Sequence, residues 1–225
     1  MIQRCGGSQT ELKILYDNEA KEGFRSGWGF SCLIGENLLF DTGADMNTLL
    51  FNMQKFDVNF NEINKVVFSH EHEDHTGGFR IIKKLGNVEV YVLGSFSRNL
   101  KSKIASFANV KLREVKELAE ISDGIFTTGE LGFFTKEQSL IIKTEKGVVV
   151  ITGCSHPGLE KILSVASKFG RNYGVIGGFH TFNKLEILRD TTLIVPCHCT
   201  TRKMEILKRY PNSTLRCSAG CIIEI

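Results

Sequence analysis

The segment "SHEHEDHTGG" at residues 69–78 concentrates metal-binding side chains directly after the apolar run "VVF". Its pattern His-x-His-x-Asp-His holds three of the six histidines of the chain, and its ligand-type residues are His70, His72, Asp74 and His75. In an extended loop the first three of these side chains fall on one side, and a following turn brings the fourth to the same point. Imidazole nitrogen and carboxylate oxygen suit zinc, iron or manganese. The segment therefore predicts a metal site, which can divide between two ions, with His70 and His72 on one and Asp74 and His75 on the other.

The other three histidines each follow a run that reads as a buried strand. His156 follows "VVVITGCS", His180 follows "YGVIGGF" and His198 follows "TTLIVPC". Ligands of α/β proteins bind outside the carboxyl ends of the strands, so all six histidines are expected at one edge of the sheets. The three later histidines are thus candidates for the second half of the metal site.

The elements that must position these residues alternate between strand-like and helix-like segments, which indicates an α/β protein. The expected strands are 11–17, 30–43, 64–70, 88–93, 139–153, 173–178 and 192–198, and the expected helices are 45–54, 77–85, 157–169 and 200–209. The stretches "SCLIGENLLFDTGAD" and "SLIIKTEKGVVVITGCS" both read as strand, polar turn, strand and polar loop. This echo favours one domain over residues 1–225, built from two similar halves.

Composition narrows the class of protein. With 42% hydrophobic and 24% charged residues the chain is an ordinary globular protein. A net charge of +3 is too small to indicate a nucleic-acid partner, and the densest basic stretch, at residues 202–209, is interpreted as a solvated helix face. No apolar run is long enough to span a bilayer, and the seven cysteines show no secreted disulfide framework, so we expect a cytoplasmic, reduced protein. A separate structural zinc site is a weaker alternative because the spacing is irregular; its members would be Cys197, Cys199, Cys217 and Cys221.

Taken together, "FDTGAD", "SHEHEDHTGG", "GCSHPG" and "PCHCT" resemble the motifs of the metallo-β-lactamase superfamily along nearly the whole chain. Within it, "YDNEA", "TTGE", "ITGCSHPG" and "IGGFHT" are similar to the dihydropterin-methyl-ribofuranosylaminobenzene phosphate synthase-like branch. The resemblance implies a four-layer αββα sandwich with the metal site along one edge, between the two sheets.

The resemblance also implies a ligand set. His70, His72 and His156 would hold a first metal, and Asp74, His75 and His198 would belong to a second position. Asp41 matches an aspartate that orients a metal-bound imidazole through a hydrogen bond.

The chain departs from the common pattern in "ITGCSH", where many superfamily members place a metal-bridging aspartate and this chain has Cys154. A thiolate there can ligate an ion or line the site. His180 becomes a candidate replacement ligand, or an acid or base that faces the substrate. One ion and two ions both stay open, with zinc preferred and iron or manganese as alternatives.

A divalent ion in this site lowers the pKa of water to roughly 7, which favours hydrolysis of a small phosphoester or acyl substrate. Asp74 or His180 would handle the proton. Two alternatives stay open: a metal-dependent synthase or transferase of pterin biosynthesis, and a non-catalytic metal-binding or sensing protein. The expected partner is a small-molecule substrate rather than a membrane, and the sequence leaves the oligomeric state open.

Overall fold

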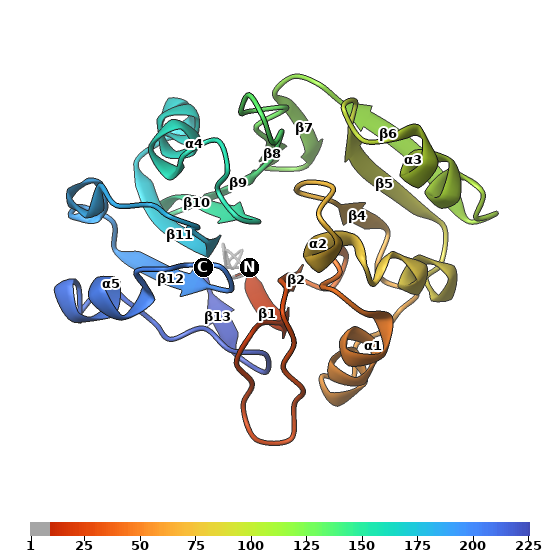
Figure 1. The fold of residues 1–225 in the computed structure, drawn as a ribbon, viewed down its shortest axis with the longest axis horizontal. Helices are drawn as coiled ribbons and strands as arrows, with labels where there is room; N and C mark the ends of the chain where they lie inside the picture. Colours follow the sequence, from red (N-terminus) through yellow and green to blue (C-terminus); the bar gives the residue numbers. More distant parts are fainter. Residues whose placement is uncertain (1–9) are drawn as a thin grey trace, which may run out of the picture.

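The computed structural model describes residues 10–225, which form two β-sheets that face each other, with helices on the outside (Figure 1). The first sheet has the order β13-β1-β2-β3-β4-β5-β6 and the second has the order β12-β11-β10-β9-β8-β7. The strands of the first sheet are β1 (Glu11–Tyr16), β2 (Ser31–Ile34), β3 (Leu38–Phe40), β4 (Lys65–Val67), β5 (Val88–Leu93), β6 (Val110–Val115) and β13 (Ile222–Glu224). Those of the second are β7 (Ala119–Ser122), β8 (Ile125–Thr127), β9 (Leu140–Thr144), β10 (Gly147–Thr152), β11 (Asn172–Gly178) and β12 (Leu193–Cys197).

The longer helices cover the outer faces of the two sheets, whereas the short α2 (Glu73–Thr76) lies near the middle of the molecule, beside β2 and β4 (Figure 1). The helical segments divide between the two halves of the chain. Those of the first half are α1 (Met46–Lys55), α2 (Glu73–Thr76), α3 (Arg98–Ala105) and the 3₁₀ turn η1 (Phe79–Lys84). Those of the second half are α4 (Leu159–Ala166), α5 (Lys203–Arg209) and the 3₁₀ turns η2 (Ser167–Phe169) and η3 (Leu185–Leu188).

Three apolar clusters give the protein four layers. β10 shows why its run "GVVVIT" is apolar throughout: Val149 and Ile151 pack between the two sheets, whereas Val148 and Val150 pack under α4. A strand with helices on one face and a second sheet on the other has no face left for solvent, so both sets of alternating side chains are apolar. The αββα sandwich expected from the sequence is therefore confirmed.

The two sequence echoes occupy equivalent places. "SCLIGENLLFDTG" forms the hairpin β2–β3 in the first sheet, and "SLIIKTEKGVVVITG" forms the hairpin β9–β10 in the second. In both halves the chain then continues through parallel strands. The loops that carry Asp41 and Cys154 consequently leave equivalent strands of the two sheets and meet in the middle of the molecule.

Several elements differ from the sequence-based expectation. Residues 73–76 form the short helix α2 with His72 at its N-cap, where we expected an extended loop and a helix that begins only at residue 77. Helix α3 was not predicted, although Ser97 caps it by accepting a hydrogen bond from the N–H of Leu100. The strands β6, β7, β8 and β13 were also missed. Of these, β6, β7 and β13 are edge strands that carry charged side chains. Within residues 10–225, no helix has the length and apolar character needed to cross a membrane.

Candidate metal centre

The residues that the sequence singled out come together where the loops after β3, β4, β10, β11 and β12 converge. Three of these residues, Asp41, His180 and His198, and also Ser155 beside His156, adopt a positive φ although they are not glycines, with φ between 42° and 62°. L-residues rarely adopt this conformation, and its cost is tolerated mainly at functional sites. Backbone strain is therefore concentrated at the ends of the strands that carry the histidines.

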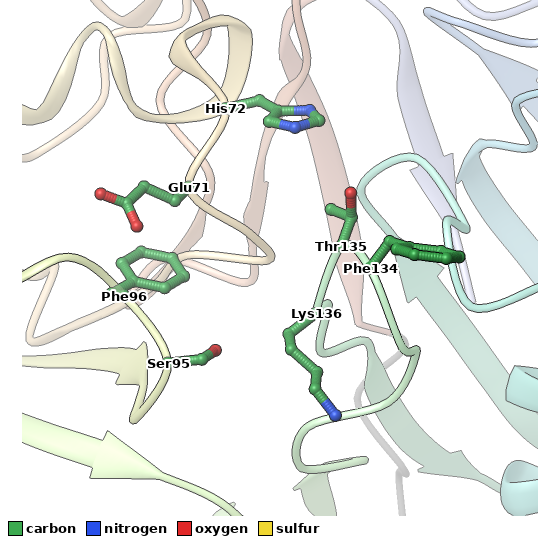
Figure 2. A pocket seen from close by; sticks show the side chains of 7 residues that line it. All are labelled: Glu71, His72, Ser95, Phe96, Phe134, Thr135 and Lys136. Atoms are coloured by element: carbon green, nitrogen blue, oxygen red, sulfur yellow. The ribbon is translucent and has the colours of Figure 1, made fainter.

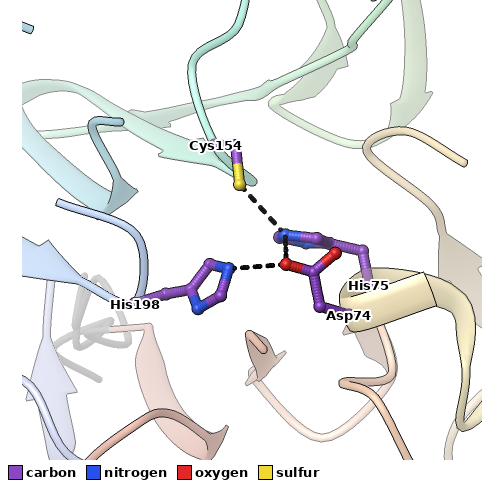
Figure 3. Close-up of side chains that lie close together, drawn as sticks. All are labelled: Asp74, His75, Cys154 and His198. Carbon is purple, nitrogen blue, oxygen red and sulfur yellow. Dashed lines mark hydrogen bonds and ion pairs between the residues drawn. The ribbon is translucent and has the colours of Figure 1, made fainter. Parts of the chain in front are cut away.

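One group of four potential ligands combines both halves of the chain (Figure 3). We call it the His198 cluster; its donor atoms all lie within 4.8 Å of one another and belong to Asp74, His75, Cys154 and His198. Asp74 and His75 come from α2, Cys154 from the loop after β10 and His198 from the loop after β12. The Nε2 atom of His75 lies 3.1 Å from the sulfur of Cys154, and the Nε2 atom of His198 lies 3.0 Å from a carboxylate oxygen of Asp74.

A second group, the His156 cluster, lies beside the first and consists of His70, Cys154 and His156. His70 also groups with His72 and Asp74. The ring centroid of His72 lies 4.6 Å from that of His70 and 5.0 Å from that of His156. Among the described residues, however, the ligand atoms of these three histidines do not all lie within 4.8 Å of one another. Cys154 belongs to both clusters, so its sulfur occupies the position between two potential ions, where many relatives were expected to have aspartate.

The four ligand histidines that are buried or nearly buried are each held through Nδ1. These contacts join His70 to the Ser69 hydroxyl at 2.9 Å, His75 to Asp41 at 2.7 Å, His156 to Glu137 at 3.0 Å and His198 to the Asn18 side-chain oxygen at 2.9 Å. When Nδ1–H donates such a hydrogen bond, Nε2 keeps its lone pair and the ring is fixed in orientation. Each of the four Nε2 atoms thus has a lone pair available to bind an ion.

Asp41 joins two of these histidines. Its carboxylate accepts hydrogen bonds from the Ser69 N–H at 2.7 Å and the Ser69 hydroxyl at 2.6 Å, in addition to the His75 ring. Because Ser69 donates to Asp41, its oxygen is free to accept from His70. Complete burial raises the pKa of Asp41 to about 8, against these hydrogen bonds and the nearby His70. A cation among the rings would favour the ionised carboxylate.

Glu137 was missed by the sequence analysis. It is completely buried, and its carboxylate accepts hydrogen bonds from the backbone N–H groups of four consecutive residues, 153–156, and from the His156 ring. Burial would raise the pKa of Glu137, but the hydrogen bonds from His156 and the nearby His70 outweigh burial and lower it. Glu137 therefore shapes the loop that carries both Cys154 and His156. No signal in the sequence pointed to it, since a lone glutamate carries no pattern.

Three observations indicate that these residues fit a metal ion. The Nε2 atom of His70 is buried and has no hydrogen-bond partner among the described residues. Burial, followed by the nearby His75, lowers the pKa of His70 to about 3, and burial likewise lowers that of His75 to about 3. The rings are thus neutral, as ligation requires. At His198, the Nε2 lone pair faces the Asp74 carboxylate, and a cation is the group that would satisfy both.

His180 and His72 flank the centre on its exposed side. The ring of His180 lies 5.0 Å from that of His156, and His180 belongs to none of the donor groups among residues 10–225. Burial and the neighbouring His156 lower the pKa of His180. The structure therefore favours the substrate-facing acid or base over the replacement ligand for His180. Two residues after β1 hold His198 in place. Asp17 accepts a hydrogen bond from the backbone N–H of His198 at 2.7 Å, and Asn18 contacts the His198 ring.

Two pockets open beside the centre. One has about 490 Å³ of empty space and lies against His72; Figure 2 shows its two walls, with Glu71, Ser95 and Phe96 on one side and Phe134, Thr135 and Lys136 on the other. A larger one, of about 750 Å³, is lined by His156 and His180. Trp28 is 62% exposed and contacts the His198 ring edge-on, with centroids 4.9 Å apart. Aromatic surface thus surrounds the polar centre.

The alternative zinc site is not assembled as the sequence suggested. Cys197 and Cys217 lie together with Asp17 in the core, whereas Cys199 contacts Cys154 instead. Cys217 packs in the apolar cluster between the sheets, as expected for a small apolar side chain, and Cys221 packs against its edge.

Comparison with known proteins agrees with the fold and the motifs. The model of the metallo-beta-lactamase superfamily matches residues 31–198, and the chain belongs to this superfamily. Two proteins of Methanocaldococcus jannaschii are each 28% identical to the chain. The first is 7,8-dihydropterin-6-methyl-4-(beta-D-ribofuranosyl)-aminobenzene-5'-phosphate synthase, and the match covers 85% of both chains. The second is an uncharacterized protein, and the match covers 95% of this chain and 100% of the other. The crystal structure of Tm1679, a metal-dependent hydrolase of the beta-lactamase superfamily, has a TM-score of 0.83 and 28% identity, covering 96% of this chain and 99% of that chain.

Proposed function

We propose that the protein is a metal-dependent hydrolase that acts on a small phosphoester or acyl substrate. The observation that carries the proposal is the common orientation of the four anchored histidines, whose Nε2 atoms face one another together with Asp74 and Cys154. His70, His72 and His156 would hold a first ion, and Asp74, His75, Cys154 and His198 would hold a second. Zinc suits this mixture of nitrogen, oxygen and sulfur donors, and iron or manganese are alternatives.

A divalent ion supplies a lowered pKa for water and stabilises negative charge that develops on the substrate. The residues of the chain would transfer the protons. Burial opposes ionisation of Asp74, but its contacts with the rings of His198 and His75 prevail and lower its pKa, so this carboxylate is ionised and able to accept a proton. His180 lies on the exposed side, and its lowered pKa favours the neutral ring, which can accept a proton there.

The substrate is expected in the pocket beside His72. Phe134 provides exposed apolar surface on one wall, and Lys136 provides a positive charge. Aromatic side chains of this kind suit a ring-containing molecule. A small molecule of this class is the expected partner, and the protein would act in the cytoplasm.

A second candidate, a metal-dependent synthase of pterin biosynthesis, is favoured by one observation. The relative named as the dihydropterin synthase shares 28% identity over 85% of both chains, which is the same identity as that of the hydrolase structure. The two candidate functions would use the same metal site: a hydrolase adds water to its substrate, whereas a synthase joins two substrates. The third alternative, a metal-binding protein without turnover, predicts ion binding with no reaction.

The test is hydrolysis of bis-p-nitrophenyl phosphate and of p-nitrophenyl esters by protein loaded with zinc, manganese or iron. We expect metal-dependent turnover that is abolished by His72→Ala and Asp74→Ala without loss of folded protein. His180→Ala should lower kcat while the metal content stays unchanged. Metal binding without hydrolysis of any of these substrates would contradict the hydrolase and direct attention to the synthase, whose assay is condensation of a pterin with an aminobenzene ribose phosphate.

A further inference from the structure

Two thiols meet at the centre of the metal site. The sulfur of Cys199 lies 3.2 Å from that of Cys154 and donates a hydrogen bond to it. Cys154 follows β10 and Cys199 follows β12, and these two strands are not neighbours, because β11 lies between them in the sheet. Contact between side chains across an intervening strand requires a specific cause.

Gly178, the last residue of β11, is that cause. A Cβ atom on Gly178 would lie 2.6 Å from the sulfur of Cys199 and 3.3 Å from the Cα atom of Cys154. Both distances are too short for ordinary contact, so any side chain at this position would occupy the space in which the thiols meet. The absence of a side chain at Gly178 thus leaves space for contact between two loops that β11 would otherwise separate.

The two thiols differ in their relation to the metal ligands. Cys154 is 3% exposed and belongs to both donor clusters, whereas Cys199 is half-buried and belongs to no group of three donors among residues 10–225. Cys199 therefore contacts the ligand sulfur from the side away from the expected ions. A bond between the two sulfurs would remove the Cys154 sulfur from the proposed second metal position and from the donor group that it shares with His70 and His156.

We propose that Cys154 and Cys199 form a redox modification site that is oxidised to a disulfide by a hydroperoxide. The more exposed Cys199 sulfur attacks one peroxide oxygen, which gives a sulfenic acid and releases an alcohol or water. The Cys154 sulfur then attacks the Cys199 sulfur, the S–S bond forms, and the hydroxyl leaves as water with the remaining thiol proton. Two thiols are oxidised and one peroxide is reduced, and reduction by a dithiol reverses the step.

The geometry places the two sulfurs within reach of each other. A disulfide has an S–S length of about 2.0 Å, so the sulfurs need to approach by about 1 Å, which rotation about the side-chain bonds of the half-buried Cys199 can supply. Cys197 and Cys217 provide an internal comparison: they also lie together, but both are completely buried, so a peroxide cannot reach them.

The test treats zinc-loaded protein with a small excess of hydrogen peroxide, followed by tryptic digestion without reductant and mass spectrometry. We expect a linkage between peptide 147–161, which contains Cys154, and peptide 190–202, which contains Cys197 and Cys199. The linkage should disappear in Cys199→Ser and persist in Cys197→Ser, which identifies the partner sulfur. Zinc released during oxidation is followed with a chromogenic chelator, and dithiothreitol should restore both thiols and zinc binding.

Three outcomes would overturn the proposal: oxidation of Cys199 to a sulfinic acid without a linkage, a linkage through Cys197, or a linkage that leaves the zinc content unchanged. Loss of zinc from reduced Cys199→Ser would also overturn it, because Cys199 would then be a ligand. The loss of zinc on oxidation rests on the proposed metal site, whereas the linkage does not. Reduced wild-type protein that binds no zinc would refute the proposed function and leave the linkage as a separate result.

Discussion

The carboxylate of Glu137 and the ring of His156 form one hydrogen-bonded unit, with 3.0 Å between the carboxylate oxygen and Nδ1. The same carboxylate accepts the N–H groups of residues 153–156, so it fixes the conformation of the loop together with the orientation of its histidine. On the other side of the centre, Asp41 holds His75 in the same way. Each half of the protein therefore supplies one buried carboxylate that orients a ligand contributed by that half.

Glu137→Gln should weaken zinc binding by about 10- to 100-fold, the usual effect of losing a hydrogen-bond partner of a metal ligand. The substituted amide keeps the shape of the side chain, but its NH₂ group faces N–H donors that the carboxylate accepted. Competition with a fluorescent zinc chelator measures the change, and the exposed Glu145→Gln provides a control of equal charge. An affinity equal to that of the control would show that Glu137 has no part in orienting His156.

Removal of single ligands should separate the two metal positions. Wild-type protein should hold about two transition-metal ions per chain. His198→Ala should reduce this to about one, since His198 belongs only to the His198 cluster, and His180→Ala should retain both ions because His180 is in neither cluster. Elemental analysis of the dialysed proteins measures the content. A wild-type content of one ion that persists in His198→Ala would refute a second metal position.

Trp28 should report the binding of an ion at His198. It is the only tryptophan of the chain, and its ring lies 4.9 Å from that of His198. Titration with Co²⁺, which quenches nearby fluorophores, should lower the tryptophan fluorescence until the His198 cluster is filled. The quenching should be lost in His198→Ala and kept in His156→Ala. Equal quenching in both variants would indicate that the ion does not bind at the His198 cluster.

The metal-free protein should lose stability as the pH falls below about 6.5. The pKa of His70 and that of His75 are lowered from 6.5 to about 3 by burial, so between these values the unfolded chain binds two protons that the folded chain does not. Asp41 acts in the opposite direction, because its pKa is raised from 3.8 to about 8 and the folded chain binds one extra proton. The net difference of one proton corresponds to about 1 kcal/mol of unfolding free energy per pH unit between pH 6 and 4.

Urea unfolding of chelator-treated protein at several pH values measures this dependence. His70→Gln removes one of the two histidines, so its stability should change little over the same range. Stability of the wild type that is constant or increases on acidification would contradict neutral, buried rings at these positions.

The types of residue that gather at the candidate metal centre were largely predicted from the sequence. The pattern of His70, His72, Asp74 and His75 predicts ligands because few segments gather such side chains, and the strand-like runs before His156 and His198 indicate where those residues lie. The fold followed from alternating elements and from motifs. These signals are local, since each depends on residues that are close together in the chain.

The residues that orient the ligands were decided by the tertiary structure. Glu137 and Asn18 lie 19 and 180 positions away from the histidines that they hold, and a single carboxylate or amide carries no local pattern that identifies a partner at such a separation. The contact of Cys154 with Cys199 likewise exists only because Gly178 leaves space between two strands that are not adjacent. The amino-acid types determined which atoms can bind a metal, and the packing of the two sheets determined which of those atoms meet, because hydrogen bonds and contacts form between neighbours in space.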